Sequence, residues 1–523
     1  MTLPDRFLYR SFEIFPGALA WGTFAAMIPA SIFAPVATSF FIIAFDLYWL
    51  LKSVFFAWHL RASYKKMQEN LKVDWMERVK SFDTHFGHEL SAEWLRKYIP
   101  SNVEGQPITY HDLYHLVIFP AYHESYDTLK ASFAALLRSS WPKEQMIVVL
   151  AIEERGGAED RAIAERISRE YGAHFFRFLV TVHPDGLPGE IPGKGSNETW
   201  AVKKVRTVLD GLAIAYERVL VSALDSDTQV SPDYFAILAH RYLTEPDPLH
   251  ASYQPVPLYH NNIWESPFFS RIISFSSTFW QMMQQVRPEQ LVTFSSHAMP
   301  FKSLVEMGYW ETDVVSEDSH IFWQALLFYD GNWRTVPLYY PVSMDANLGH
   351  TFWETIKNVY RQQRRWAWGS ENIAYLLFGS LKNPRMPLAK KITFNFQQIE
   401  GFWTWATNSI IIFSLGWLPP LLGGNEFSGS VLAHNLPRIT QIIMTLAMVG
   451  LLSSAVVSLL ILPPRPATAP RVPLAWMFLQ WLTIPLVTVV LGSIPAIEAQ
   501  TRLALGHRLG FWPTPKRRRG IMN

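Results

Sequence analysis

Two acidic motifs stand where carboxylates could take part in chemistry. Asp225-Ser226-Asp227 directly follows an apolar run, and two carboxylates on one tight turn can hold a hard divalent ion such as Mg²⁺ or Mn²⁺. Ser316-Glu317-Asp318 precedes an apolar helical pattern at 321–328, where a carboxylate can act as general base toward an attacking hydroxyl. The alternative interpretations are a solvated acidic turn for the first motif and a helix N-cap for the second.

Acidic residues also follow two other predicted strands. Tyr122 and Glu124 come directly after the apolar run 116–121, and Glu153 comes after the run 147–152. Carboxylates at neighbouring strand ends can accept hydrogen bonds from a nucleobase edge or a ribose hydroxyl. Ordinary exposed acids are the alternative interpretation.

A glycine-rich stretch offers groups for a diphosphate. Residues 189–197 read GEIPGKGSN, and their backbone amides together with Lys194 could contact phosphate oxygens. The stretch is not a P-loop, because Gly195 stands where that motif requires Ser or Thr. A flexible loop that binds no ligand is the alternative.

One predicted helix, at 351–378, carries an amide, a guanidinium and an indole side chain. Gln362, Arg365 and Trp366 stand at i, i+3 and i+4, so their side chains share one helix face. A guanidinium suits phosphate oxygens, and an indole offers a flat platform for a sugar ring. The same helix has an apolar stripe beside a basic one, which also fits a lipid-surface anchor without a chemical role.

The elements that must position these groups alternate between strands and helices. Short β-branched runs predict strands at 116–121, 147–152, 175–180 and 219–223, and helical patterns fall between them at 129–137, 158–171 and 197–209. This alternation predicts an α/β domain with a mostly parallel sheet and helices on both faces. Such sheets bind ligands at the carboxyl ends of their strands, where the acidic motifs stand.

Apolar blocks flank this domain. The block 12–60 predicts two membrane helices joined near Pro29–Pro35, and the runs 402–422, 439–462 and 472–497 are each long enough to cross a bilayer. The predicted organisation is a helix pair at 1–60, a cytosolic domain at 61–390 ending in the interfacial helix, and membrane helices with a basic tail at 391–523.

Two arrangements of the chain in the membrane are consistent with the sequence. Five crossings would put the termini on opposite sides, yet the basic residues around the last run, including Lys516–Arg519, place both ends in the cytoplasm by the positive-inside rule. Either 472–497 is re-entrant around Pro485, or it crosses and leaves a positive tail outside. Five crossings are our expectation.

Composition excludes several classes of protein. With 49% hydrophobic and 17% charged residues the chain is not intrinsically disordered. Without cysteine it has no disulfide, cysteine-ligated zinc or cysteine nucleophile. A net charge of +2 argues against a nucleic-acid partner, whereas 21 Trp fit a chain that meets a lipid–water interface.

The order of the motifs resembles a known family. PAYHE, paired acids, GKG, DSD, SED and QQRRW, set between membrane helices, resemble the processive membrane-integrated glycosyltransferases typified by cellulose synthase, and more broadly the inverting A-type family 2 glycosyltransferases. The resemblance covers 116–369. Ser316-Glu317-Asp318 followed by Asp330–Arg334 looks like T-E-D…G-W-R, and Gln362–Trp366 fits Q-x-x-R-W. Thr293–His297 stands near the F-x-C-G-S acceptor motif without its Cys or Gly.

The resemblance implies a role for each candidate residue. Asp318 would be the catalytic base, and Arg365 would also be catalytic by stabilising the charge on the leaving group. Asp227 with Asp225 would hold Mg²⁺ or Mn²⁺. The nucleotide sugar would be bound by Tyr122, Glu124, Glu153, Lys194 and Asp225, with Lys194 near the uracil or the diphosphate. The diphosphate and the acceptor would be held by Gln362, Arg365 and Trp366.

The expected activity is transfer of a sugar, with inversion, from a nucleotide diphosphate donor, expected to be UDP-linked, to a hydroxyl acceptor. A multi-pass protein of the plasma or inner membrane, with its catalytic domain facing the cytoplasm, would build a polysaccharide in this way. One alternative is a single transfer to a ceramide-type or polyprenyl-type lipid. A remote one is a transporter without enzymatic activity, but among ionisable residues in the apolar runs Asp46 is nearly alone.

Overall fold

The protein is described by a computed structural model that covers residues 2–85, 108–413, 415–514 and 518. Its chain divides into two compact units. The helical unit consists of 1–64, 266–279 and 350–509, and the sheet unit consists of 65–265, 280–349 and 510–523. Of the basic tail expected at Lys516–Arg519, only Arg518 lies within the described residues.

The sheet unit is organised around one sheet of eight strands. In space their order is β3-β2-β1-β4-β7-β6-β8-β5. Their bounds are β1 Tyr114–Ala121, β2 Met146–Glu153, β3 Arg177–His183, β4 Val219–Ala223, β5 Gln229–Val230, β6 Ala251–Leu258, β7 Ala298–Pro300 and β8 Arg334–Ser343. The β-branched runs expected as strands form β1 to β4, which are parallel neighbours. Beyond β4 the sheet is mixed, because β7 runs antiparallel to β4 and β6 whereas β6 and β8 are parallel.

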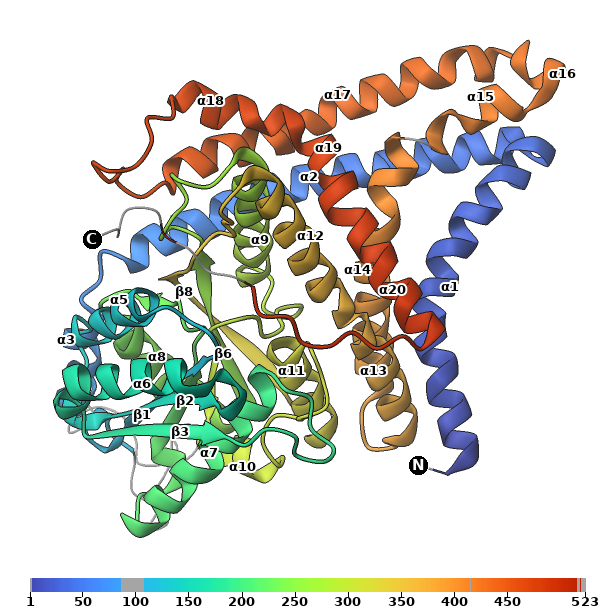
Figure 1. Ribbon diagram of the computed structural model, residues 1–523. Helices are drawn as coiled ribbons and strands as arrows, with labels where there is room; N and C mark the ends of the chain where they lie inside the picture. Colours follow the sequence, from blue (N-terminus) through green and yellow to red (C-terminus); the bar gives the residue numbers. More distant parts are fainter. Residues whose placement is uncertain (1, 86–107, 414, 515–517, 519–523) are drawn as a thin grey trace. The chain divides into compact units, whose positions relative to one another are not determined.

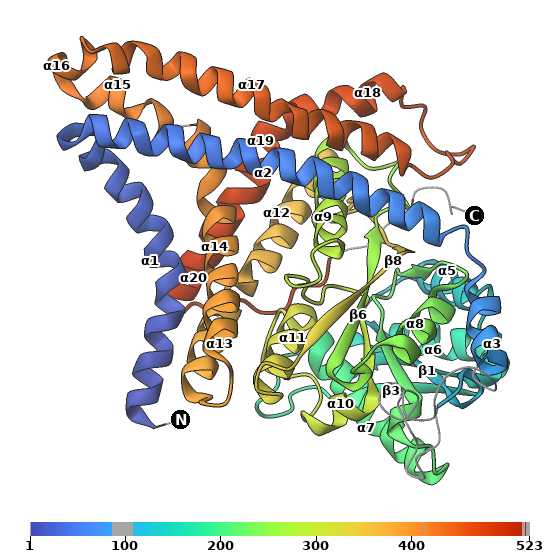
Figure 2. The same cartoon turned by 180° about the vertical axis from the view of Figure 1, so that it is seen from behind.

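Helices cover both faces of the parallel strands, as Figure 1 shows. The helices of the sheet unit are α3 Trp75–His85, α5 Tyr126–Leu137, α6 Gly157–Tyr171, α7 Lys194–Gly211, α8 Tyr234–Thr244, α10 Phe301–Glu306 and α11 Glu317–Phe328. Alternate residues of β1 and β2, such as Phe119 and Leu150, pack with Phe133 of α5 and Ile167 of α6 in the main apolar core. Helix α7 contacts β1, β2 and β3 on the other face, and α8 packs against β8 (Figure 2). The α/β fold expected from the alternating pattern is thus confirmed.

The helical unit contains the apolar segments. Its helices are α1 Leu3–Phe33, the first part of α2 Pro35–Asn70, the first part of α9 Phe268–Gln285, α12 Phe352–Ala367, α13 Glu371–Lys382, α14 Leu388–Phe413, α15 Leu418–Leu422, α16 Gly424–Ser428, α17 Val431–Leu460, α18 Leu474–Leu479, α19 Ile484–Thr488 and α20 Ile494–Leu505. The α1–α2 junction falls at Ala34, within the predicted Pro29–Pro35 region.

Among the described residues, four helices are long and apolar enough to cross a membrane. They are Leu3–Phe33, Pro35–Asn70, Val431–Leu460 and a helical stretch from Leu474 to Leu505 that includes α18, α19 and α20. This last stretch continues through Pro485 to Leu505 rather than reversing at the proline. The run 402–422 is different from our expectation: it is shared between the end of α14, a 3-10 turn and α15, so it is not one helix.

The helix expected at 351–378 is also interrupted. Helix α12 ends at Ala367, a 3-10 turn occupies Trp368–Ser370, and α13 begins at Glu371. The interruption begins two residues after Trp366, so the Q-x-x-R-W residues form the last turns of α12 rather than the middle of a longer helix.

Candidate active site

The acidic motifs meet at one edge of the sheet. Because β1, β2 and β4 are parallel neighbours, the residues that follow each strand lie at the same carboxyl edge. Ser226, between the two aspartates that follow β4, donates a hydrogen bond of 2.8 Å to Glu124, which follows β1. Two motifs recognised separately in the sequence therefore share one polar contact.

Lys194 contacts several of the carboxylates at this edge of the sheet. It begins α7, and its Nζ lies 2.6 Å from Asp318 Oδ1 and 2.9 Å from Asp225 Oδ1. Carboxylate oxygens of Glu317 and Glu198 follow at 3.7 and 3.8 Å. The glycine-rich loop, the D-S-D turn and the S-E-D helix start are thus joined through one buried ammonium.

The charges in this cluster are strongly coupled. Burial by itself would lower the pKa of Lys194, but the charges of Asp225, Asp318 and the neighbouring glutamates outweigh it and hold that pKa well above its usual value. Burial raises the pKa of Glu198 well above the usual range, and Lys194 only partly opposes this. At neutral pH the lysine is therefore charged.

Asp318 lies in the first turn of α11. Ser316 occupies the N-cap position, but its side chain makes no capping hydrogen bond. The Asp318 side chain is 23% exposed, and His297 Nδ1 lies 3.9 Å from its Oδ1. Burial lowers the pKa of His297 to about 4, so this imidazole is neutral at pH 7 and adds no positive charge beside Asp318.

Asp227 faces another part of the same edge. Its Oδ2 accepts a hydrogen bond of 2.8 Å from the backbone N–H of Asp345, which follows β8. The Asp345 carboxylate in turn accepts hydrogen bonds from Asn261 at 2.8 Å and from Arg518 at 2.8 Å. Burial and the nearby charge of Asp227 raise the pKa of Asp345 to about 6, against the opposing effect of Arg518.

The donor atoms at this edge suit a hard cation. Asp225, Asp227 and Asp345 supply only carboxylate oxygens, the ligands that Mg²⁺ and Mn²⁺ prefer. Within the described ranges, no group of three or more His, Asp or Glu side chains is arranged to hold an ion without further ligands.

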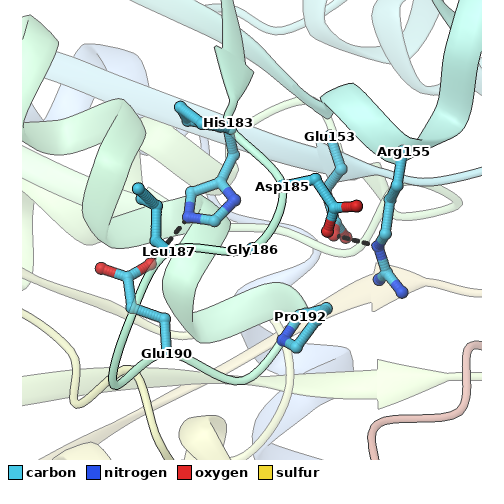
Figure 3. A pocket seen from close by; sticks show the side chains of 9 residues that line it. Glu153, Arg155, His183, Asp185, Gly186, Leu187, Glu190 and Pro192 are labelled. Carbon is cyan, nitrogen blue, oxygen red and sulfur yellow. Dashed lines mark hydrogen bonds and ion pairs between the residues drawn. The ribbon is translucent and has the colours of Figure 1, made fainter.

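A pocket adjoins the ends of β2 and β3 (Figure 3). Its polar lining includes two pairs: Glu153 accepts a hydrogen bond of 2.6 Å from Arg155, and His183 lies 2.8 Å from Glu190. The Arg155 guanidinium also stands 3.9 Å from the centre of the Tyr122 ring. Two residues expected to bind the nucleotide, Tyr122 and Glu153, are therefore linked through one arginine at the pocket.

The remaining candidates lie in the helical unit. Gln362, Arg365 and Trp366 are on α12, and Trp366 packs against an apolar cluster with Val359 and Phe269. Glu498 of α20 accepts hydrogen bonds from Tyr360 at 2.7 Å and from Arg364 at 2.6 Å. The meeting of these residues with Asp318 stays a prediction.

Several residues of the site were missed in the sequence. Ser295 donates a hydrogen bond of 2.5 Å to Asp225, which places the Thr293–His297 segment beside the D-S-D turn. Asp345 lies two residues after the end of β8, and no strand was expected there, so its position at the sheet edge was missed. Arg518 carries no local signal, because its partner lies 173 residues away.

Comparisons with known proteins give these findings. No curated protein matches the chain. Among solved structures, the mannosyltransferase PcManGT from Pyrobaculum calidifontis in complex with GDP-Man and Mn²⁺ is similar at 14% identity and a TM-score of 0.39, over 80% of this chain and 99% of that one. S. aureus TarS 1-349 is similar at 12% identity and a TM-score of 0.34, over 66% of this chain and 90% of that one.

These structural likenesses are low, and the assignment depends on the sequence family instead. The family model described as "Glycosyl transferase family group 2" matches residues 220–494, more than half of the 523 residues. The match begins in β4, directly before Asp225, and includes Asp318 and the Gln362–Trp366 motif. The closer resemblance to cellulose synthases stays a prediction. The chain belongs to glycosyl transferase family group 2.

Proposed function

We propose that this protein is a membrane-bound inverting glycosyltransferase that moves a sugar from a UDP-linked donor to a hydroxyl acceptor during polysaccharide synthesis. The single observation that carries the proposal is the contact of one ammonium, that of Lys194, with both Asp318 and Asp225. A general base and a donor-binding carboxylate that share one cation are close enough to act on one small substrate.

Asp318 is the base in this mechanism. Its carboxylate takes the proton of the acceptor hydroxyl as that oxygen attacks the anomeric carbon. The new carbon–oxygen bond forms on the face opposite the diphosphate, the bond from the anomeric carbon to the diphosphate oxygen breaks, and the nucleoside diphosphate leaves. Such proton transfer typically contributes about 10²–10⁴-fold to the rate.

Positive charge near the leaving diphosphate is the second requirement. Lys194 supplies one such charge and also orients Asp318 through its hydrogen bond of 2.6 Å. Arg365 on α12 is proposed to supply another. Asp227 and Asp225 would hold Mg²⁺ or Mn²⁺, which when bound neutralises charge that develops on the diphosphate.

The pocket in Figure 3 is the proposed site of the nucleobase. Glu153 can accept a hydrogen bond from a ring N–H, and Arg155 can donate to a carbonyl oxygen on the same edge. Tyr122 and Glu124 complete the nucleoside site. Gln362 and Trp366 are proposed to contact the diphosphate and the acceptor sugar.

The protein is proposed to lie in the plasma or inner membrane with its sheet unit in the cytoplasm. Within the described part of the chain, four helical stretches of 30 to 36 residues have the length and the apolar composition of membrane spans. Arg61, Lys65 and Lys66 follow the apolar part of the second helix, which favours a cytoplasmic position for the residues that come next.

The test uses the full chain purified in detergent with Mn²⁺ or Mg²⁺. UDP-, GDP- and other nucleotide sugars are offered with a lipid extract, and the products are analysed by mass spectrometry. A polymer ladder from a UDP-sugar supports the proposal. A single glycolipid species assigns a lipid acceptor instead, and the absence of both transfer and donor hydrolysis with every donor contradicts enzymatic function.

The base is tested by Asp318→Asn. Turnover is expected to fall about 10²–10⁴-fold while donor binding is retained. Asp210→Asn, on the exposed last turns of α7, is the matched control and keeps the parent rate. Turnover of Asp318→Asn at the parent rate would show that another group takes the proton.

A further inference from the structure

Two buried carboxylates from distant strands meet at the sheet edge. Asp227 follows β4 and Asp345 follows β8, and the backbone N–H of Asp345 donates a hydrogen bond of 2.8 Å to Asp227 Oδ2. Both side chains are buried. Two like charges that are close together and shielded from water repel each other, so the pair requires a cation.

A cation from the chain itself meets this requirement. The Arg518 guanidinium donates hydrogen bonds to Asp345 Oδ1 at 2.8 and 3.1 Å and to Oδ2 at 3.2 Å. The Arg518 side chain is 13% exposed, so its ion pair with Asp345 is largely buried rather than exposed at the surface. Asn261 donates to the same Oδ1 and to the backbone oxygen of Asp227, which fixes the two acidic segments against each other.

An independent contact holds the tail on the same unit. Phe511 packs against Gly193, directly before Lys194: a Cβ atom at Gly193 would lie 2.8 Å from Phe511 Cγ. Only glycine leaves room for this approach. The tail therefore contacts the sheet unit both at the glycine-rich loop and at the carboxylates beside Asp227.

We propose that Asp227 and Asp345 form one cation site, which Arg518 fills in the absence of substrate and which a divalent ion takes over when the donor binds. This inference rests on the proposed function for the identity of the ion. It adds Asp345 to the residues that hold the ion, and it gives the basic tail a role as a competing cation.

Arg518 and a divalent ion are expected to compete because both are cations that bind the same carboxylate. A guanidinium and a divalent ion both need the carboxylate oxygens of Asp345, so the two cannot bind there together. Entry of the ion displaces Arg518, and the donor diphosphate then supplies further oxygen ligands that complete the coordination shell of the ion. Removal of the arginine is therefore expected to strengthen binding of the bare ion.

The experiment titrates Mn²⁺ into the full chain without nucleotide and follows the free ion by electron paramagnetic resonance. Arg518→Gln is expected to lower the Kd for Mn²⁺ roughly tenfold, because the ion no longer displaces a bound cation. Arg518→Lys keeps the charge and is expected to stay near the parent value. Asp345→Asn is expected to raise the Kd roughly tenfold and to abolish the gain from Arg518→Gln in the double variant.

The matched control is Arg508→Gln, an exposed arginine ten positions earlier in the chain. A Kd for Arg518→Gln within twofold of the parent value, or an equal shift in Arg508→Gln, overturns the competition. A parent Kd in Asp345→Asn overturns its role as a ligand, and so does the absence of Mn²⁺ binding in every form. Sugar transfer measured separately with and without a chelator decides on the proposed function, since the titration involves no transfer.

Discussion

The ammonium of Lys194 lies 2.6 Å from the carboxylate of Asp318, although the two residues stand 124 positions apart. Each begins or nearly begins a helix, and the two helix starts approach each other at the edge of the sheet. The close approach of their backbones is possible because Gly195 follows the lysine.

Removal of the Lys194 charge is expected to destabilise the sheet unit. Since the folded-state pKa is raised above the unfolded value, the stabilisation is fully present at neutral pH and is lost only as pH rises through the folded value. Lys194→Met leaves buried carboxyls without their cation, which typically costs about 3–5 kcal/mol. Thermal unfolding in detergent measures this, and the deficit should shrink in acid as the carboxyls bind protons.

Lys204→Met is the control for that variant, because Lys204 lies on the same helix with its side chain exposed. We expect it to unfold at the parent temperature. Equal unfolding temperatures for the two variants would mean that the ammonium of Lys194 contributes no stability.

Glu153 and its neighbour Glu154 form a matched pair for the nucleotide site. Glu153 is buried at the end of β2, whereas the Glu154 side chain is 51% exposed. A hydrogen bond to a charged group contributes about 1.5–3 kcal/mol, so Glu153→Gln is expected to weaken nucleoside diphosphate binding about 10- to 100-fold. Isothermal titration with UDP checks this. Equal affinities for Glu153→Gln and Glu154→Gln would remove Glu153 from the site.

Two glycines at opposite ends of α7 should respond in opposite ways to alanine. A Cβ atom at Gly195 would lie 3.0 Å from Glu317 Cβ and 3.1 Å from the Glu311 carbonyl oxygen, whereas no atom lies within 4 Å of one at Gly211. Gly195→Ala is expected to destabilise the fold by about 1–3 kcal/mol, and Gly211→Ala to stabilise it by up to about 1 kcal/mol. Unfolding curves that rank the two variants in the other order would contradict the close approach.

His115 makes stability depend on pH. It is fully buried between the rings of Trp141 and Phe235, and burial lowers its pKa to about 3. Below pH 6.5 the unfolded chain binds a proton that the folded chain does not, so stability falls with acid by about 1.4 kcal/mol per pH unit.

The midpoint of unfolding of the parent is therefore expected to fall more steeply between pH 7 and pH 5 than that of His115→Leu. His174→Leu changes an exposed histidine and should follow the parent. Parallel curves for the parent and His115→Leu would mean that the buried imidazole is protonated in both states.

The local patterns predicted the first half of the sheet unit closely. The alternation of β-branched runs and helical patterns from 116 to 223 corresponds to β1 through β4 with their helices, because each element is long enough to show its own period. Lys194 illustrates a shift at one boundary: the helix expected from Asn197 begins three residues earlier, since the GKG segment itself forms the first turn.

The partners of the site residues could not be predicted in the same way. The D-S-D and S-E-D motifs were visible as motifs, but the contacts of Lys194 with both depend on long-range packing. Arg518 belongs to a basic cluster that we interpreted as a signal for membrane topology, which is the usual reason for such residues. No local sequence pattern indicates its hydrogen bonds to Asp345. The break at Trp368–Ser370 likewise falls within a sequence whose hydrophobic period continues through it.

The docking of Phe511 and Arg518 on the sheet unit has a consequence for how the chain threads the bilayer. A polypeptide that leaves the aqueous compartment of β8 and later returns to it must make an even number of passages in between. The two long apolar helices that lie between these points, Val431–Leu460 and Leu474–Leu505, satisfy this parity. A third passage through 402–422 would put Arg518 on the side of the membrane opposite β8, so the contact favours an even number of passages among the described residues that follow β8.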